Sequence, residues 1–250
     1  MKIMDAVFRR ELRSFESSLY FPLARLPRHP LMRLPAFTED LRRTITERLQ
    51  VWPRHAADPR HTVDTGHAGH KALKRAAVSV ILTDDGQGQA ALVLTLRPSH
   101  MKNHANQYAL PGGRLDEGES EEAAALREMR EEIGLKLAPG AILGRLDDYV
   151  TRSGYLITPL VAWAPAGATF TPNPEEVAEI YRVPLSELAL PGSPQFISIP
   201  ESDRPVIRYP LLGTLIHAPT AAVMYQFMEV AIFGRDTRVH HLEQAVFAWR

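Results

Sequence analysis

Three glutamates stand close together near the middle of the chain, at Glu128, Glu131 and Glu132. On an α-helix these positions are i, i+3 and i+4, so the three carboxylates share one face. Like charges on one face repel each other unless a cation lies between them. A hard divalent cation that prefers oxygen ligands, Mg²⁺ or Mn²⁺, fits this need. The spacing therefore predicts a metal site on this helix.

The residues around these glutamates favour a helix that is fixed at both ends. Ser120 can cap its N-terminus, and Gly134 suits a left-handed cap after its last turn. Residues 123–126 are three alanines and a leucine, which are strong helix formers. Just before the helix, residues 111–113 read Pro-Gly-Gly, which allows a tight turn and a close approach of the backbone to a ligand. The pattern predicts a loop, a capped helix and a carboxylate site in that order.

Residues 113–135 read GRLDEGESEEAAALREMREEIGL. This segment resembles the Nudix box, G-x5-E-x7-R-E-U-x-E-E-x-G-U, in which U is a bulky apolar residue. Every fixed place is filled, by Gly113, Glu119, Arg127, Glu128, Met129, Glu131, Glu132, Gly134 and Leu135. A solvated acidic surface helix is the alternative, but such a helix needs neither the glycines nor the arginine at this spacing. The resemblance implies an α/β fold, the Nudix-type α/β/α sandwich with a mixed β-sheet.

The resemblance also implies a metal-dependent enzyme whose metal ligands are Glu128, Glu131 and Glu132. A main-chain carbonyl of Gly112 or Gly113 can join these carboxylates. The expected ion is Mg²⁺ or Mn²⁺, and three carboxylates are enough for two or more ions. The expected reaction is hydrolysis of the pyrophosphate bond in a nucleoside diphosphate linked to another group. Metal ions help such a reaction because they neutralise charge and lower the pKa of bound water.

Other residues are expected to support the reaction beside the metal ligands. Arg127 is expected to pair with Glu119 and to steer the carboxylates, since an unsupported ligand would be misaligned. The general base is either a glutamate of the box, Glu131 or Glu132, or it is Glu176 from a later loop. The alternative for Glu176 is an exposed residue at the start of a strand.

A second resemblance lies in the loop before the box, LTLRPSHMKNHANQYALPGG. It is similar to the extra motif of Nudix enzymes that hydrolyse coenzyme A, roughly L-L-T-x-R-S/A-x(3–4)-L-x-x-H-x-G-Q-x-x-F-P-G-G. The matching residues are Thr95, Arg97, Ser99, His104, Gln107, Pro111, Gly112 and Gly113. Three places depart from the motif: Asn103 replaces an apolar residue, Asn106 a glycine and Leu110 a phenylalanine. Asn106 is a mild change, because asparagine tolerates unusual backbone angles.

The same loop and the start of the box supply the expected substrate-binding residues. Arg97 and Arg114 carry planar forks that suit phosphate oxygens, and coenzyme A carries a pyrophosphate and a 3′-phosphate. His104 and Gln107 offer neutral hydrogen bonds, either to the substrate or to the backbone of the loop itself. Ser99 completes the set as a match to the motif.

The expected activity is hydrolysis of coenzyme A or its thioesters to adenosine 3′,5′-bisphosphate and (acyl-)4′-phosphopantetheine. The alternative is the same chemistry on ADP-ribose or another dinucleotide, and dependence on the 3′-phosphate would separate the two. A more remote alternative is a nucleotide-sensing module without activity. Such a module is expected to lose box carboxylates, and here all are present. The expected partner is therefore a small nucleotide that resembles coenzyme A.

The composition is that of an ordinary globular protein. Among 250 residues, 45% are hydrophobic, and 29 basic residues balance 29 acidic ones, so the net charge favours neither nucleic-acid nor membrane binding. The absence of cysteine excludes disulfides and thiolate metal sites and is compatible with a reducing cytoplasm. No apolar run approaches the roughly 20 residues of a membrane span. We expect a cytoplasmic protein, for which a homodimer is compatible with the sequence.

Two regions are expected along the chain. Residues 1–70 form a helical N-terminal extension and a polar linker, and a helix that opens at Thr38 packs on the main domain or on a partner subunit. Residues 71–250 form the catalytic domain and end in a buried helix after Pro219. The linker carries four histidines without the other ligands of a metal site, namely His55, His61, His67 and His70. Strands are expected at residues 76–82, 91–96, 142–150, 156–164, 176–185, 195–199 and 206–212.

Overall fold

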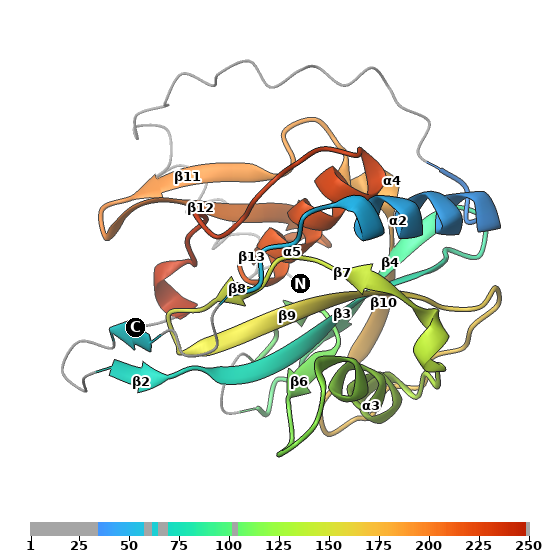
Figure 1. Cartoon of the computed structure of the whole chain (residues 1–250), viewed down its shortest axis with the longest axis horizontal. Coiled ribbons are helices and arrows are strands. Elements are labelled where there is room, and N and C mark those ends of the chain that lie inside the picture. The colour runs from blue at the N-terminus through green and yellow to red at the C-terminus, as the bar shows by residue number, and fades with distance from the viewer. Residues whose placement is uncertain (1–34, 58–61, 65–69, 102–104, 249–250) are drawn as a thin grey trace, which may run out of the picture. The chain divides into compact units, whose positions relative to one another are not determined.

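The computed structural model describes residues 35–57, 62–64, 70–101 and 105–248 (Figure 1). Residues 34–250 form one compact unit. Among the residues expected to contact the substrate, His104 lies outside the described part of the chain. His61 and His67 of the expected linker also lie outside it.

The centre of the fold is a mixed β-sheet of eight strands. These are β3 Lys74–Asp84, β4 Ala90–Leu96, β5 Tyr108–Ala109, β6 Gly112–Arg114, β7 Ile142–Arg145, β8 Tyr149–Val150, β9 Tyr155–Trp163 and β10 Glu179–Pro184. The main path runs β10-β4-β3-β9-β7, and β5, β6 and β8 pair with β4, β3 and β9 beside that path. β3 and β9 are parallel, whereas the other pairs are antiparallel. The sheet is therefore mixed, as predicted.

Helices cover both faces of this sheet (Figure 1). On one face lies α3, Glu121–Ile133. The other face carries α2, Glu39–Val51, and α5, Thr220–Phe227, which continues as the π-helical turn η2, Met228–Ile232. Each face has its own cluster of buried apolar residues. The predicted α/β/α sandwich is confirmed.

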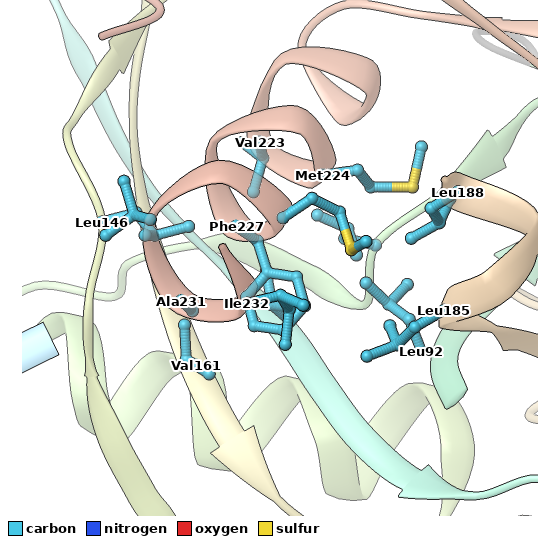
Figure 2. Packing of buried hydrophobic residues seen from close by; sticks show 14 of the residues in the cluster. Leu92, Leu146, Val161, Leu185, Leu188, Val223, Met224, Phe227, Ala231 and Ile232 are labelled. Carbon is cyan, nitrogen blue, oxygen red and sulfur yellow. The ribbon is translucent and has the colours of Figure 1, made fainter. Parts of the chain in front are cut away.

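Successive residues of the central strands point to opposite layers. In β3, Ala77 belongs to the cluster beneath α3, whereas Val80 belongs to the larger cluster on the other face. Figure 2 shows this larger cluster, where Phe227 of α5 packs near sheet residues such as Leu92 and Val161. The helix expected near the C-terminus is therefore buried, as predicted.

α2 begins at the cap that the sequence predicts. The hydroxyl of Thr38 accepts a hydrogen bond from the N–H of Leu41 at 3.3 Å. The residues that α2 buries are Leu41, Ile45 and Leu49, as the predicted apolar stripe requires. Arg48 donates to the carbonyl oxygens of Ala231 at 3.0 Å and Ile232 at 2.5 Å, where a cation meets the end of a helix. These contacts fix α2 within the same compact unit as the sheet.

The segment 142–150, expected as one strand, forms the two strands β7 and β8 instead. Two aspartates between them turn into the protein and bind arginines. Asp147 accepts from Arg238 at 3.1 Å, and Asp148 accepts from Arg54 at 2.5 Å. A continuous strand would place these neighbours on opposite faces, so the two buried ion pairs interrupt it.

The segment 53–71, expected as a polar linker, contains two short strands. β1, Thr62–Asp64, and β2, His70–Ala72, pair in antiparallel fashion. Before them, the N–H of His55 donates to the carboxylate of Asp147 at 2.6 Å. The start of this segment is therefore attached to the domain through the same inward-facing aspartate.

A second sheet of three strands covers part of the larger cluster. It has the order β11-β12-β13 and consists of β11 Gln195–Ile199, β12 Ser202–Leu211 and β13 Thr214–His217. The short helix α4, Leu185–Leu188, precedes it, and 3₁₀ turns lie at Pro139–Ala141 and Val246–Ala248. Among the described residues, no helix has both the length and the apolar character needed to cross a membrane.

Candidate active site

α3 is held at both ends by the caps that the sequence predicts. The Ser120 Oγ accepts from the N–H of Ala123 at 3.2 Å. At the other end Gly134 adopts a φ of 67°, and its N–H donates to the carbonyl of Arg130 at 3.2 Å. The apolar residues that the helix buries are Ala124, Ala125, Met129 and Ile133. The helix therefore has a fixed rotation relative to the sheet, which also fixes the direction of its glutamates.

Arg127 is the centre of a hydrogen-bonded network on α3. Its Nε and Nη2 donate to the two carboxylate oxygens of Glu119, both at 3.0 Å. Its Nη1 donates to Glu128 at 2.8 Å and to Glu131 at 3.0 Å. The Nη2 also donates to the carbonyl of Arg114 at 2.9 Å. One guanidinium therefore connects the helix, the loop before it and strand β6.

Two glycines bring the backbone of β6 against the glutamates. A Cβ atom on Gly113 would lie 2.2 Å from Oε1 of Glu128, so a side chain there would displace the Glu128 carboxylate from its present position. Gly112 has a φ of 152°, and its N–H donates to Oε2 of Glu132 at 3.0 Å. A Cβ atom on Gly112 would lie 2.2 Å from the carbonyl oxygen of Ala77. Position 112 therefore requires glycine, because both its backbone angle and the neighbouring backbone exclude a side chain.

Burial raises the pKa of two of these carboxyl groups. Glu132 is 6% exposed, and burial raises its pKa to about 8. The charges of Glu128 and Glu176 raise this pKa further, while the charge of Arg97 lowers it. Burial also raises the pKa of Glu128, in opposition to its hydrogen bond from Arg127. The positive charges of Arg97 and Arg127 therefore do not fully offset the carboxyl groups that lie close together here.

Glu176 reaches this site from a separate loop and is half-buried there. The N–H of Asn173 donates to the carbonyl of Glu132 at 2.9 Å, which ties the loop to α3. The N–H of Ala178 donates to the carbonyl of Leu96 at 2.8 Å, which ties the loop to β4. The charge of Glu176 raises the pKa of Glu132.

Arg97 follows β4, and its charge acts on Glu132. The backbone around Arg97 closes the loop, since its N–H donates to the carbonyl of Gln107 at 3.0 Å and its carbonyl accepts from Asn106 at 3.2 Å. Asn106 has a φ of 56°, in the left-handed region that the glycine of the motif would adopt easily. The Arg97 Nε is buried and has no hydrogen-bond partner within the described ranges. Gln107 is half-buried and Ser99 is exposed.

Arg114 is exposed and lies against an aromatic ring that the sequence does not mark as part of a site. Its Nη2 donates to the hydroxyl of Tyr155, and its guanidinium carbon lies 5.2 Å from the ring centroid. The Nζ of Lys74 lies 5.7 Å from the same centroid. Lys74 and Tyr155 belong to no motif, so only the pairing of strands shows that they are neighbours of Arg114.

The donors on α3 suit a hard divalent cation in their chemistry. Glu128, Glu131 and Glu132 offer carboxylate oxygens, and the backbone of Gly113 touches the first of them. In this structure Glu128 and Glu131 are bound by Arg127. Within the described ranges, no three histidine, cysteine, aspartate or glutamate residues are grouped so as to hold a metal ion. The three carboxylates share a helix but do not converge on one point in this structure, where Arg127 and the N–H of Gly112 bind them.

The sequence of this chain is similar to a known protein family and to individual members of it. The family model of the NUDIX domain matches residues 73–208. Over 130 residues the chain is 35% identical to a Yersinia pestis (strain Pestoides F) protein named "Uncharacterized Nudix hydrolase NudL". That match covers 52% of this chain and 64% of the relative, so the chain spans less than two thirds of the relative's length.

Solved structures of two proteins are also among those to which the chain is similar. A MutT/nudix family protein from Enterococcus faecalis is 18% identical, with a TM-score of 0.45 over 66% of each chain. The MutT protein from Methanosarcina mazei Go1 is 23% identical, with a TM-score of 0.38. The latter match covers 48% of this chain and 84% of the other.

Proposed function

Because the chain belongs to the Nudix family, we propose that it hydrolyses the pyrophosphate bond of nucleoside diphosphate derivatives with the help of a divalent metal ion. The observation that carries this proposal is the contact between the box glutamates and the two glycines. Glu128 lies against Gly113, and Glu132 accepts from the N–H of Gly112. Carboxylates and backbone of this kind are what a hard cation and a phosphate require in one place.

The three glutamates of α3 would hold the metal ion, together with a backbone carbonyl of Gly112 or Gly113. When bound, the ion neutralises charge on the phosphate oxygens and lowers the pKa of the attacking water. Arg127 keeps the carboxylates in position, and the two hydrogen bonds to Glu119 keep Arg127 in position. Mg²⁺ and Mn²⁺ are the ions that we propose.

The general base is Glu176 or a glutamate of the box, in the mechanism that we propose. Support for Glu176 comes from its loop, which is bonded to both α3 and β4 and brings its charge to Glu132. The charge of Arg97 acts on the same glutamate, and its buried Nε has no hydrogen-bond partner within the described ranges, which supports a role in binding phosphate oxygens.

Coenzyme A or its thioesters are the substrates that we propose within this class. Support comes from the described part of the loop, where the two residues that depart from the motif are structurally compatible with it. Asn106 adopts the left-handed conformation in place of glycine, and Leu110 is buried in the core in place of phenylalanine. ADP-ribose or another dinucleotide is the alternative substrate. A nucleotide-sensing module without activity is less consistent with a complete set of box carboxylates.

Hydrolysis of coenzyme A, ADP-ribose and diadenosine polyphosphates, each with Mg²⁺ or Mn²⁺, tests this proposal. We expect coenzyme A to be the best substrate and chromatography to show 4′-phosphopantetheine and adenosine 3′,5′-bisphosphate. A clear preference for ADP-ribose or a dinucleotide would keep the chemistry and overturn the choice of substrate. If the folded protein cleaved none of them with either ion, the proposed reaction would be wrong.

A further inference from the structure

Three side chains form a cationic cluster beside the box, and we call them the Tyr155 cluster: Lys74, Arg114 and Tyr155. The Nζ of Lys74 lies 5.7 Å from the centroid of the Tyr155 ring, and the guanidinium carbon of Arg114 lies 5.2 Å from it. The Nη2 of Arg114 also donates a hydrogen bond to the Tyr155 hydroxyl. One aromatic ring therefore gathers two cations.

Strand register places these three residues on one face of the sheet. Lys74 in β3 lies opposite Tyr155 in the parallel strand β9. Arg114 in β6 lies opposite Ala76, two residues further along β3. Residues two apart on a strand share a face, whereas the next residue, Ala77, faces the cluster beneath α3. The Tyr155 cluster therefore lies on the face of the sheet opposite to α3.

Both cations of the Tyr155 cluster are available to an anion. Lys74 and Arg114 are exposed, and neither has a carboxylate partner among the described residues. Their neighbour Arg75 differs, because it forms an ion pair with Glu121 of α3. An aromatic ring attracts cations through its quadrupole but does not cancel their charge. The two positive charges therefore remain uncompensated.

A phosphate monoester matches this arrangement. The arginine fork can bind two phosphate oxygens, and the lysine adds a point charge beside it. The hydrogen bond to Tyr155 limits the directions in which the Arg114 guanidinium can point. The backbone of Arg114 borders the network on α3, because its carbonyl accepts from Arg127 at 2.9 Å, while its side chain lies on the other face of the sheet. A phosphate bound at the cluster could belong to the same substrate as the pyrophosphate. A substrate bound at both places would therefore extend from one face of the sheet to the other.

We propose that the Tyr155 cluster binds a second phosphate of the substrate, a monoester remote from the bond that is cleaved. This inference rests on the proposed function and adds a determinant of specificity to it. In coenzyme A the group would be the 3′-phosphate, which dephospho-coenzyme A and ADP-ribose lack. Lys74 and Tyr155 then affect the binding of the substrate and leave the chemical step unchanged.

The variant Lys74→Gln tests this role, since it removes the charge from an exposed side chain and keeps most of its length. We expect the KM for coenzyme A to rise about tenfold, which corresponds to the loss of one good charged contact. Its kcat for coenzyme A and its KM for dephospho-coenzyme A should not change. Lys136→Gln, at an exposed lysine beyond the end of α3, is the matched control. Equal KM ratios in Lys74→Gln and the control would overturn the inference.

Tyr155→Phe provides a second variant that keeps the ring and removes the hydroxyl. Because Arg114 loses one of the bonds that orient it, we expect a smaller rise in the KM for coenzyme A, about threefold. Circular dichroism would show whether the fold is intact. An unchanged KM in this variant would contradict the orienting role of the hydroxyl.

Calorimetry with the metal-free full chain gives a readout that does not depend on turnover. We expect adenosine 3′,5′-bisphosphate to bind more tightly than adenosine 5′-monophosphate, and Lys74→Gln to remove that difference. If no substrate is hydrolysed but this difference depends on Lys74, the proposed function fails and the inference stands. If coenzyme A is hydrolysed and both nucleotides bind equally to the unmodified chain, the inference fails and the proposed function stands.

Discussion

Two buried glutamates of this protein, Glu243 and Glu132, lie in opposite electrostatic surroundings. Glu243 is 1% exposed and accepts hydrogen bonds from Arg152, from the hydroxyl of Ser202 and from the N–H of Gln244. Burial alone would raise its pKa, but these bonds lower the pKa to about 2. Glu132 is 6% exposed, and there burial raises the pKa to about 8.

This difference separates a carboxylate whose charge the fold satisfies from one whose charge it leaves unsatisfied, as expected of the metal ligand that we propose. A charge taken out of water destabilises the fold unless hydrogen bonds and opposite charge replace the water. The chain supplies all of these to Glu243. For Glu132 the structure gives one hydrogen bond, from Gly112, and the charges of two neighbouring glutamates act against its ionisation. A metal ion would supply the missing positive charge.

The largest effect is expected from removing the charge of Glu132. We expect Glu132→Gln to lose turnover by roughly 10³-fold or more, because an amide is a poor ligand for a hard cation. Without metal, its free energy of unfolding should change little, since a pKa of about 8 leaves the Glu132 carboxyl mostly protonated at neutral pH and the amide is neutral as well. Steady-state hydrolysis and urea unfolding measure the two quantities.

Two further variants complete this test. Glu131→Gln should lose turnover in the same way, whereas Glu117→Gln, at an exposed glutamate before the helix, should keep it. Retained activity in both Glu131→Gln and Glu132→Gln would show that the metal ligands are assigned wrongly.

The next largest effect is expected at acid pH, through Glu243. Its pKa is about 2 in the folded protein and ordinarily 4.5, so the unfolded chain binds the proton first as the pH falls. The stability that Glu243 contributes is present above about pH 4.5 and is lost as the pH approaches 2, by on the order of 3 kcal/mol. Urea unfolding between pH 5 and 2 measures this loss. In Glu243→Gln the free energy of unfolding should depend less on pH over this range. An unchanged pH dependence in this variant would show that Glu243 does not cause the loss.

A smaller effect is expected from Arg127→Lys. A lysine ammonium cannot form the paired bonds to Glu119 and still hold Glu128 in place. We expect kcat to fall about 10- to 100-fold, as for other groups that orient metal ligands, with little change in stability. Arg43→Lys, at an exposed arginine of α2 that pairs with Asp40, is the control. Equal kcat values for the two variants would mean that Arg127 does not orient the site.

The smallest effect is expected from Ser202→Ala, which removes one hydrogen bond to Glu243 at 2.9 Å. Because the other partners remain, we expect the free energy of unfolding to fall by about 1 kcal/mol and kcat to stay the same. Ser198→Ala, at an exposed position of β11, is the control for stability. A loss of activity without a loss of stability would contradict the structural role of this region.

The local sequence was sufficient to predict the helix α3 and its ends. Helical geometry fixes which residues share a face, so the spacing of Glu128, Glu131 and Glu132 already placed them together. Ser120 and Gly134 act through bonds to residues within five positions, and the structure confirms both caps. The mixed sheet between helices also followed from the resemblance to the Nudix box and is confirmed. The substrate stays a prediction.

Local sequence patterns did not predict the division of residues 142–150 into two strands. Apolar and β-branched residues there favour one strand, and the pattern carries no information on distant partners. Asp147 binds Arg238, 91 residues later, and Asp148 binds Arg54, 94 residues earlier. A contact of this kind depends on how the ends of the chain pack on the sheet.

Only the tertiary structure decided which distant residues join the site. Glu176 reaches Glu132 because its loop bonds to α3 and to β4, and no spacing in the sequence fixes that path. Lys74 and Tyr155 reach Arg114 through the pairing of β3 with β6 and β9. The sequence by itself determined the glutamates, glycines and arginine of the box, because helix and turn geometry act over a few residues. Strand register and loop packing act over the whole chain, so the surroundings of the box had to come from the folded structure.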